Sequence, residues 1–169
     1  MKPSLLLFAC LMSAPVMAQA SPKDTGTPVN QIEAVIEDFR SAIITKDKDR
    51  FVKLLLHEDI TWQSVMSDES LQRIRQKNSN ATKVEVNRKN NPITFIDGIV
   101  AGKHRIEEKF SNIRIDTDGD VASVYLDYSF HVDGRETNHG KEAWHLVNTE
   151  AGWKLVSVVW SKRLSPAPK

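Results

Sequence analysis

The feature that most constrains the fold is the dipeptide Asp133-Gly134, which joins two segments of alternating apolar and polar residues. An Asp-Gly pair in this setting is typical of a two-residue β-hairpin turn. A second turn over Thr149–Gly152 leads into another alternating segment. We therefore predict three consecutive antiparallel strands within Val121–Ser161.

The hairpin turn also predicts which side chains share a face of this sheet. A two-residue turn places Tyr125 opposite Glu142, and successive side chains of a strand point to opposite faces. One face carries Tyr125, Asp127, Glu142, Trp144 and Ser157, and one of the two faces should be covered by the helices. The opposite face is also apolar and needs a cover, most simply a second copy of the protein. Its most apolar members are Phe130, Val158 and Trp160.

The first twenty residues have the pattern of a secretory signal peptide. Lys2 is followed by the apolar run Leu5–Met12 and by the small-residue cleavage signal Ala18-Gln19-Ala20. We expect cleavage after Ala20 and a periplasmic or secreted protein without membrane insertion. The apolar run is short for a membrane anchor, which needs roughly 20 residues. A lipoprotein attached through Cys10 is the second-ranked alternative.

The charge balance of the chain excludes some classes of partner. The sequence has 23 basic residues, of which Lys2 lies in the signal peptide, and 22 acidic residues. A nearly neutral chain lacks the basic surface that nucleic-acid-binding proteins use to neutralise phosphates, so we expect no nucleic-acid partner. The only cysteine also lies in the signal peptide, and the exported domain must therefore be held by its core without disulfides.

The remaining chain reads as one domain. Residues 21–28 predict a flexible leader, residues 29–163 a single domain and residues 164–169 a tail. A first helix is indicated by apolar residues at helical spacing from Ile32 to Ile43, with Asn30 as its cap. A second helix should begin after Asp47.

The middle of the chain predicts a mixture of short elements. Ile60–Met66 is rich in strand-forming residues, and Ser67 should cap a short helix after it. We predict a strand over Ile93–Val100 and a helix over Gly102–Phe110, where apolar residues stand four positions apart.

No metal or cofactor is predicted. Asp116–Asp120 has acidic residues at the first, third and fifth positions, as calcium loops do, but Val121 stands where such a loop needs glycine. A hairpin turn is the better interpretation. The histidines show no metal-ligand spacing such as H-E-x-x-H.

The order of elements and several motifs of the last third resemble a known superfamily. The motifs are Asp118-Gly119-Asp120-Val121, Tyr128-x-Phe130, Asp133-Gly134 and Gly152-Trp153-Lys154. They are similar to the nuclear transport factor 2-like superfamily, which includes SnoaL-like proteins, ketosteroid isomerase and scytalone dehydratase. Within it, they look most like a branch of small exported bacterial proteins described as lumazine-binding.

This resemblance implies an α+β fold shaped like a cone. In such proteins N-terminal helices pack on a strongly bent, mostly antiparallel sheet and enclose a pocket, and the outer sheet face often forms dimers. The side that faces the helices usually includes the tryptophan of the Gly-Trp-Lys motif, so the resemblance implies that the face of Asp127 and Glu142 is the interior one. No catalytic His-Asp pair of the dehydratases matches residues of this chain, so the resemblance transfers no enzyme activity.

Two carboxylates on the face expected to be interior are the candidate catalytic residues. Asp127 and Glu142 would lie near each other in an apolar cone, which would raise one pKa and give a usable general base. Alternatively, Asp127 is solvated at the mouth and Glu142 pairs with a Lys or Arg. The candidate ligand-binding residues, some of which could instead be core, are Trp62, Tyr125, Trp144 and Ser157.

The sequence therefore predicts an exported domain that holds a small aromatic or apolar molecule in the cone. We favour a binding protein with no demonstrated catalysis, and a homodimer could form through the face of Phe130, Val158 and Trp160. One alternative is a cofactor-independent lyase or isomerase with Asp127 or Glu142 as general base. Another is a structural or interaction module whose cone is filled.

Overall fold

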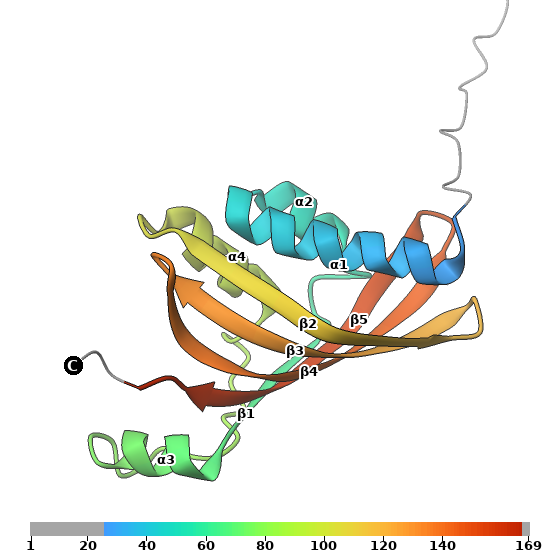
Figure 1. Cartoon of the computed structure of the whole chain (residues 1–169). Coiled ribbons are helices and arrows are strands. Elements are labelled where there is room, and N and C mark those ends of the chain that lie inside the picture. Colours follow the sequence, from blue (N-terminus) through green and yellow to red (C-terminus); the bar gives the residue numbers. More distant parts are fainter. Residues whose placement is uncertain (1–25, 167–169) are drawn as a thin grey trace, which may run out of the picture.

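Five strands form one bent sheet, and three helices cover its concave face (Figure 1). The computed structural model describes residues 26–166, and the signal peptide expected for residues 1–20 lies outside them. The elements are α1 (Pro28–Thr45), α2 (Lys48–Lys53), β1 (Thr61–Met66), α3 (Asp68–Arg75), α4 (Pro92–Ala101), β2 (Ile106–Thr117), β3 (Val121–Val132), β4 (Arg135–Thr149) and β5 (Gly152–Leu164). None of the helices in this described part is long and apolar enough to cross a membrane.

The sheet has the order β1-β5-β4-β3-β2. β1 runs parallel to β5, and every other pair of neighbours is antiparallel. α1, α2 and α4 lie on the concave face, whereas α3 lies beyond the far end of the sheet (Figure 1). The predicted α+β arrangement of helices on a mostly antiparallel sheet is therefore confirmed.

Side-chain caps set the starts of the first helices. α1 is capped by Thr27, whose Oγ1 accepts a hydrogen bond from the Asn30 backbone N–H at 3.3 Å, and Pro28 opens the helix. The predicted cap at Asn30 is thus wrong by about one turn. The predicted caps of α2 and α3 are confirmed: Asp47 accepts from the Arg50 N–H, and Ser67 accepts from the Ser70 N–H.

The predicted strand over Ile93–Val100 is wrong, because these residues form α4. Asn91 and Thr94 make a reciprocal capping box: the Asn91 side chain accepts from the Thr94 N–H at 2.9 Å, and the Thr94 hydroxyl accepts from the Asn91 N–H at 3.2 Å. Pro92 occupies the first helical position, where a missing N–H costs nothing. This start signal outweighs the strand preference of the isoleucines.

The predicted helix over Gly102–Phe110 is also wrong, because β2 begins at Ile106. Phe110 pairs with Tyr128 and Glu108 pairs with Phe130 in the ladder between β2 and β3. The two apolar residues of this segment, four positions apart, fit the period of a strand as well as that of a helix. Pairing with β3 decides in favour of the strand.

All three predicted hairpin turns are present. Asp133 and Gly134 have φ values of 52° and 79°, as a turn with two left-handed residues requires, and Val132 pairs with Arg135. At the turn between β2 and β3, the Asp118 carboxylate accepts hydrogen bonds from the Asp120 and Val121 N–H groups at 3.0 Å each. Asp118 therefore stabilises a hairpin turn.

A β-bulge at Thr137 changes the register of the central hairpin. His131 pairs with Glu136, but the next pair is Phe130 with Asn138, so that Thr137 is an extra residue of β4. Beyond this point Tyr125 pairs with Ala143, and the predicted opposition of Tyr125 and Glu142 is wrong. The whole of β3 beyond the bulge consequently presents the opposite set of side chains to the helices.

A second bulge at Val156 has the same effect in β5. Leu146 pairs with Leu155, but His145 pairs with Ser157, so that Val156 is the extra residue. Trp153 and Leu155 on one side of it, and Val158 and Trp160 on the other, all face the helices. Phe130, Val158 and Trp160 were expected on a dimer surface, and that placement is wrong because the bulges turn them inward.

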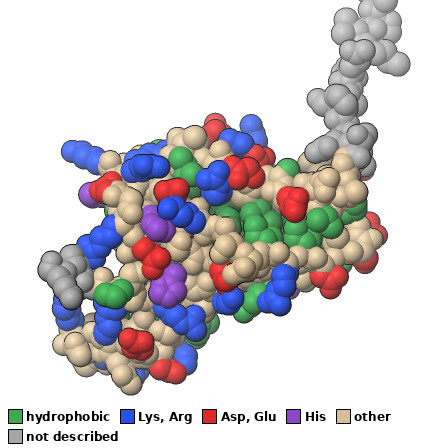
Figure 2. Space-filling view, in the orientation of Figure 1, with side chains coloured by type: hydrophobic (Ala, Val, Ile, Leu, Met, Phe, Trp, Pro, Cys, Tyr) green, Lys and Arg blue, Asp and Glu red, His purple; other side chains and the backbone are tan. Residues whose placement is uncertain are grey.

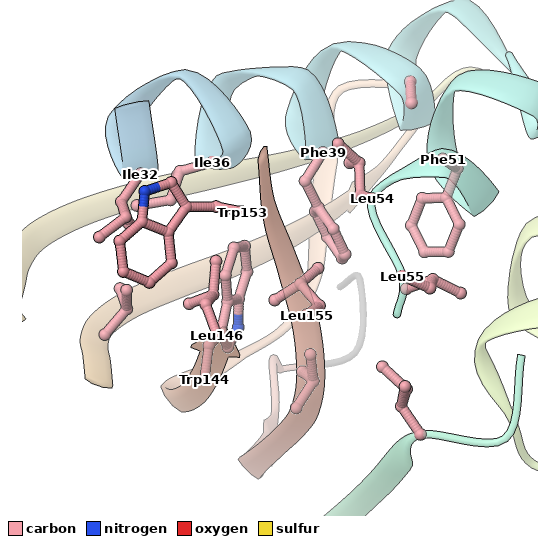
Figure 3. Close-up of a cluster of buried hydrophobic side chains, with 14 of the residues drawn as sticks. Ile32, Ile36, Phe39, Phe51, Leu54, Leu55, Trp144, Leu146, Trp153 and Leu155 are labelled. Carbon is pink, nitrogen blue, oxygen red and sulfur yellow. The ribbon is translucent and has the colours of Figure 1, made fainter. Parts of the chain in front are cut away.

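The core lies between α1 and the inner face of β4 and β5 (Figure 3). Trp153 lies against Ile32 and Ile36, and its Nε1–H donates to the Gln31 side-chain oxygen at 3.1 Å. The rings of Phe39 and Trp144 are centred 4.8 Å apart. Burial of these large side chains supplies the main driving force for folding.

We predict that Gly140→Ala destabilises the protein. A Cβ at this position would lie 2.0 Å from the Ser161 carbonyl oxygen, and backbone cannot move aside without distorting β4 and β5. The loss should be about 1 to 3 kcal/mol in the free energy of unfolding, measured by urea denaturation.

Gly98→Ala in α4 is the matched control, because a Cβ there meets nothing within 4 Å. Alanine is the better helix former, so this variant should gain about 0.5 to 1 kcal/mol. A Gly140→Ala variant as stable as the wild type would contradict the close approach of β4 to β5.

Candidate functional site

A cavity of about 170 Å³ lies between the helices and the inner face of the sheet. Its apolar walls are aromatic or branched side chains from two helices and three strands: Phe39, Trp62, Phe95, Phe130, Val158 and Trp160. Its polar groups come from four strands of the sheet: Glu108, Tyr128, Asn138, Glu142 and Lys162.

The aromatic walls form a continuous group of contacts. The Trp62 ring is centred 5.2 Å from that of Trp160 and 5.3 Å from that of Phe95, and Phe95 lies 6.2 Å from Phe130. Such distances are typical of packed aromatic pairs. The cavity is close in size to the roughly 150 Å³ known to hold benzene, so that one six-membered ring would fill it.

Two carboxyl groups lie in this apolar setting without a cationic partner. Glu108 on β2 and Glu142 on β4 are each only 5% exposed. Trp144 donates its Nε1–H to the Glu142 carboxylate at 2.7 Å. Within residues 26–166 neither glutamate forms an ion pair, and Glu108 accepts no hydrogen bond. Few protein hydrogen bonds and no ion pair among these residues therefore replace the water that the two carboxyl groups lose on burial.

Burial changes the protonation of both glutamates. Loss of hydration raises the pKa of Glu142 to about 7, although the hydrogen bond from Trp144 works in the opposite direction. Loss of hydration, with repulsion from Glu142, raises the pKa of Glu108 well above its ordinary value. Near neutral pH the pair therefore carries less than its full charge of two, and protons can move to or from it.

Tyr128 lies on β3, between the strands that carry the two glutamates. Its hydroxyl donates to the Asn138 side-chain oxygen at 2.9 Å. Burial and the charges of Glu142 and Glu108 raise the pKa of Tyr128, so the phenol stays protonated and acts as a hydrogen-bond donor. The inner end of the cavity thus combines two carboxyl groups, a phenol and an amide.

Three of the predicted site residues lie at or beside this cavity. Glu142 and Trp62 line it. Trp144 is completely buried in the core and reaches the site only through its hydrogen bond to Glu142.

The other three predicted site residues lie on the outer face of the sheet. Asp127 forms an ion pair with Lys141 and accepts from the Asn112 side chain at 2.7 Å, and these two partners hold its pKa below the ordinary value. Tyr125 stacks beneath the Arg114 guanidinium. Ser157 pairs with His145 across the β4–β5 ladder. The two carboxylates that were expected to act together are thus on opposite faces.

The sequence reasoning missed Glu108, Tyr128, Asn138 and Lys162. Glu108 was hidden by the incorrect helix over Gly102–Phe110, although Ile106, Glu108 and Phe110 alternate as a strand would. The predicted register, with Asp127 inside, leaves the neighbouring Tyr128 outside, because the Thr137 bulge has no sequence signal of its own.

Other features of the described residues offer less chemistry. A larger groove of about 550 Å³ lies beside the start of α1 and the turn between β4 and β5, but two of its charged residues, Asp38 and Arg50, pair with each other. Within residues 26–166 no group of three or more His, Cys, Asp or Glu side chains could hold a metal ion.

We predict a pH dependence of stability to which Glu142, together with Glu108, contributes. Glu142 has a pKa of about 7 in the folded protein and about 4.3 in an unfolded chain, so the folded state binds more protons between these values. Its contribution to stability is therefore greatest below about pH 4 and is lost as the pH rises towards 7. The loss is about 1.4 kcal/mol for each unit by which the pKa is raised.

Urea denaturation at pH 5, 6, 7 and 8 would measure this loss. Glu142→Gln and Glu108→Gln should each reduce the decline, because both glutamates have raised pKa values, whereas the control Asp127→Asn, on the outer face, should keep it in full. Parallel profiles for the wild type and Glu142→Gln would contradict the raised pKa.

Comparison with known proteins gives the fold. No protein-family model matches the sequence, and no curated protein matches it. A candidate dehydratase of the NTF2-like family from Streptomyces avermitilis is 17% identical with a TM-score of 0.58, over 82% of this chain and 98% of that chain. A candidate scytalone dehydratase from Novosphingobium aromaticivorans is 15% identical with a TM-score of 0.55, over 82% and 84%. An NTF2-like protein from Cytophaga hutchinsonii is 15% identical with a TM-score of 0.53, over 80% and 98%.

At these identities the likeness concerns the backbone. It agrees with the motifs of the last third of the chain and with the helices that cover the concave face of the sheet. The chain has the cone-shaped α+β fold of the nuclear transport factor 2-like superfamily.

Proposed function

We propose that this protein binds a small molecule in the cavity, with an apolar ring or a body of similar size between the aromatic walls. A polar group of that molecule would face Glu108 and Glu142. The observation that carries the proposal is the pair of buried carboxyl groups, without a cation, at an aromatic-walled cavity of about 170 Å³.

The energetics of the carboxyl pair support a ligand site over a purely structural cone. Burying a carboxylate without a cation costs several kcal/mol, and apolar residues of similar size would stabilise the fold better. Groups kept in a cleft at such a cost, with strongly raised pKa values, are typical of functional sites. A filled, structural cone would need neither the carboxyl groups nor the space beside them.

Export and dimerisation are part of the same proposal. The signal-peptide pattern of residues 1–20 supports binding in the periplasm or outside the cell. A homodimer would have to use the outer face of the sheet, where Val121 and Tyr125 are exposed. On the face shown in Figure 2, acidic and basic side chains are interspersed around a band of hydrophobic side chains.

A thermal-shift experiment tests the binding proposal. We expect single-ring probes such as benzyl alcohol, benzylamine and 4-hydroxybenzaldehyde to include at least one that raises the melting temperature with concentration. At a concentration of 100 times the Kd, the stabilisation would be about 2.7 kcal/mol. Trp62→Leu, in the cavity wall, should reduce the shift, and Tyr125→Phe, on the outer face, should not. An absence of stabilisation across a library of one-ring and two-ring compounds would count against the proposal.

A second candidate function is proton-transfer catalysis by Glu142, as in a cofactor-independent lyase or isomerase. The pKa of about 7 favours it, because a general base acts best when its pKa is close to the working pH. Two of the similar structures are candidate dehydratases, which supports the same class of reaction.

The base-promoted ring opening of 5-nitrobenzisoxazole tests this candidate. A carboxylate removes the ring C–H proton while the N–O bond breaks, and the product is a coloured cyanophenolate. We expect a rate above that of buffer, increasing with pH around 7, and a loss of about 100-fold or more in Glu142→Gln. Asp127→Asn should keep the full rate. A rate independent of Glu142 would reject catalysis and leave the binding proposal intact.

A further inference from the structure

Glu108 is the buried polar group of the cavity that has the fewest partners. It is 5% exposed and lines the cavity, and within residues 26–166 it has neither a hydrogen bond nor an ion pair. Glu142 next to it has only the Trp144 N–H. Two neighbouring carboxyl groups with one donor between them leave several acceptor positions open to whatever occupies the cavity.

Among residues 26–166, no cationic side chain forms an ion pair with Glu108 or Glu142. Lys162 lines the cavity but forms no ion pair with either glutamate. It also lines an adjoining groove of about 400 Å³, together with Glu85 and Lys89, and this places it where the cavity meets the groove. The charge of Arg163 works to lower the pKa of Tyr128, but Arg163 is not among the groups that change the pKa of Glu108 or Glu142.

The aromatic walls of the cavity would also favour a positively charged ligand. Trp62, Trp160, Phe95 and Phe130 line the cavity. The face of an aromatic ring attracts a cation, most strongly for tryptophan, and the attraction grows when water is excluded. A negative inner end and aromatic sides therefore select for positive charge on the ligand.

We infer that the ligand is a small organic cation, an amine or quaternary ammonium compound about the size of one six-membered ring, with its positive group against Glu108 and Glu142. This inference rests on the proposed binding function and adds the charge of the ligand. It also explains why the fold keeps two buried carboxyl groups that destabilise it. A bound cation would lower the pKa of both groups and favour their ionised state.

Choline and its carbon isostere 3,3-dimethyl-1-butanol provide the test, because they have the same shape and differ in charge. Isothermal titration calorimetry at pH 8 should give an affinity for choline at least about tenfold higher than for the isostere. Benzylammonium and benzyl alcohol form a second pair with the same expected order.

Two further measurements test whether the preference for a cation over its neutral isostere depends on Glu108 and Glu142. Choline carries a permanent charge, so its affinity should fall as the pH is lowered from 8 to 6 while Glu142 takes up a proton. At pH 7 choline binding should release protons, measured as a dependence of the binding enthalpy on the ionisation enthalpy of the buffer. The isostere should show neither effect.

Glu108→Gln and Glu142→Gln should each weaken choline binding at least about tenfold and leave the isostere unchanged. Both variants remove a buried carboxyl group, and they should fold at least as well as the wild type. Asp127→Asn is the control, because its carboxylate is on the outer face.

The failures of the two proposals are distinguishable. If each cation and its isostere bind equally well, the inference about charge is wrong and the binding function stands. If neither these compounds nor neutral single-ring probes bind, both are wrong.

Discussion

The phase of the sheet decides what the cone contains, and two extra residues set that phase. Thr137 in β4 and Val156 in β5 each shift the pairing by one position. As a result, Tyr128, Phe130, Val158 and Trp160 face the helices, whereas Tyr125 and Asp127 face outward. Without these bulges the interior would hold a different set of aromatic and acidic groups, because a shift of one residue exchanges the faces of a strand.

The buried carboxyl pair destabilises the fold, whereas the aromatic core stabilises it. Trp144 belongs to both: its ring packs against Phe39 and Phe110, and its N–H contacts Glu142. The buried side chains around Trp153, Ile32 and Ile36 pack between α1 and the sheet, and their burial can offset the cost of the buried carboxyl groups. A stable aromatic core is thus the condition under which a chemically unusual site can persist.

The fold was easier to predict from the sequence than the site, because turns and helix caps depend on only a few neighbouring residues. Turns and caps such as Asp133-Gly134, Asp47 and Ser67 are short-range signals, and the structure confirms them. The capping box of Asn91 and Thr94 is a signal of the same kind, but the predicted strand over Ile93–Val100 follows the isoleucines instead. The bulges follow from tertiary packing, and neither Thr137 nor Val156 differs from an ordinary strand residue. Asp127 was therefore placed inside, and Glu108 was overlooked.

The contact between Gly140 and the Ser161 backbone limits how this site could diversify. Asn138 and Glu142 lie two residues on either side of Gly140, and backbone contact with β5 holds their spacing. The backbone positions from which Asn138 and Glu142 reach the cavity are therefore fixed. Phe95 comes from α4, which is joined to the sheet by longer connections and can shift without breaking a strand ladder. Relatives with other ligands would be expected to differ first in α4 and the segment before it, while the polar end stays constant.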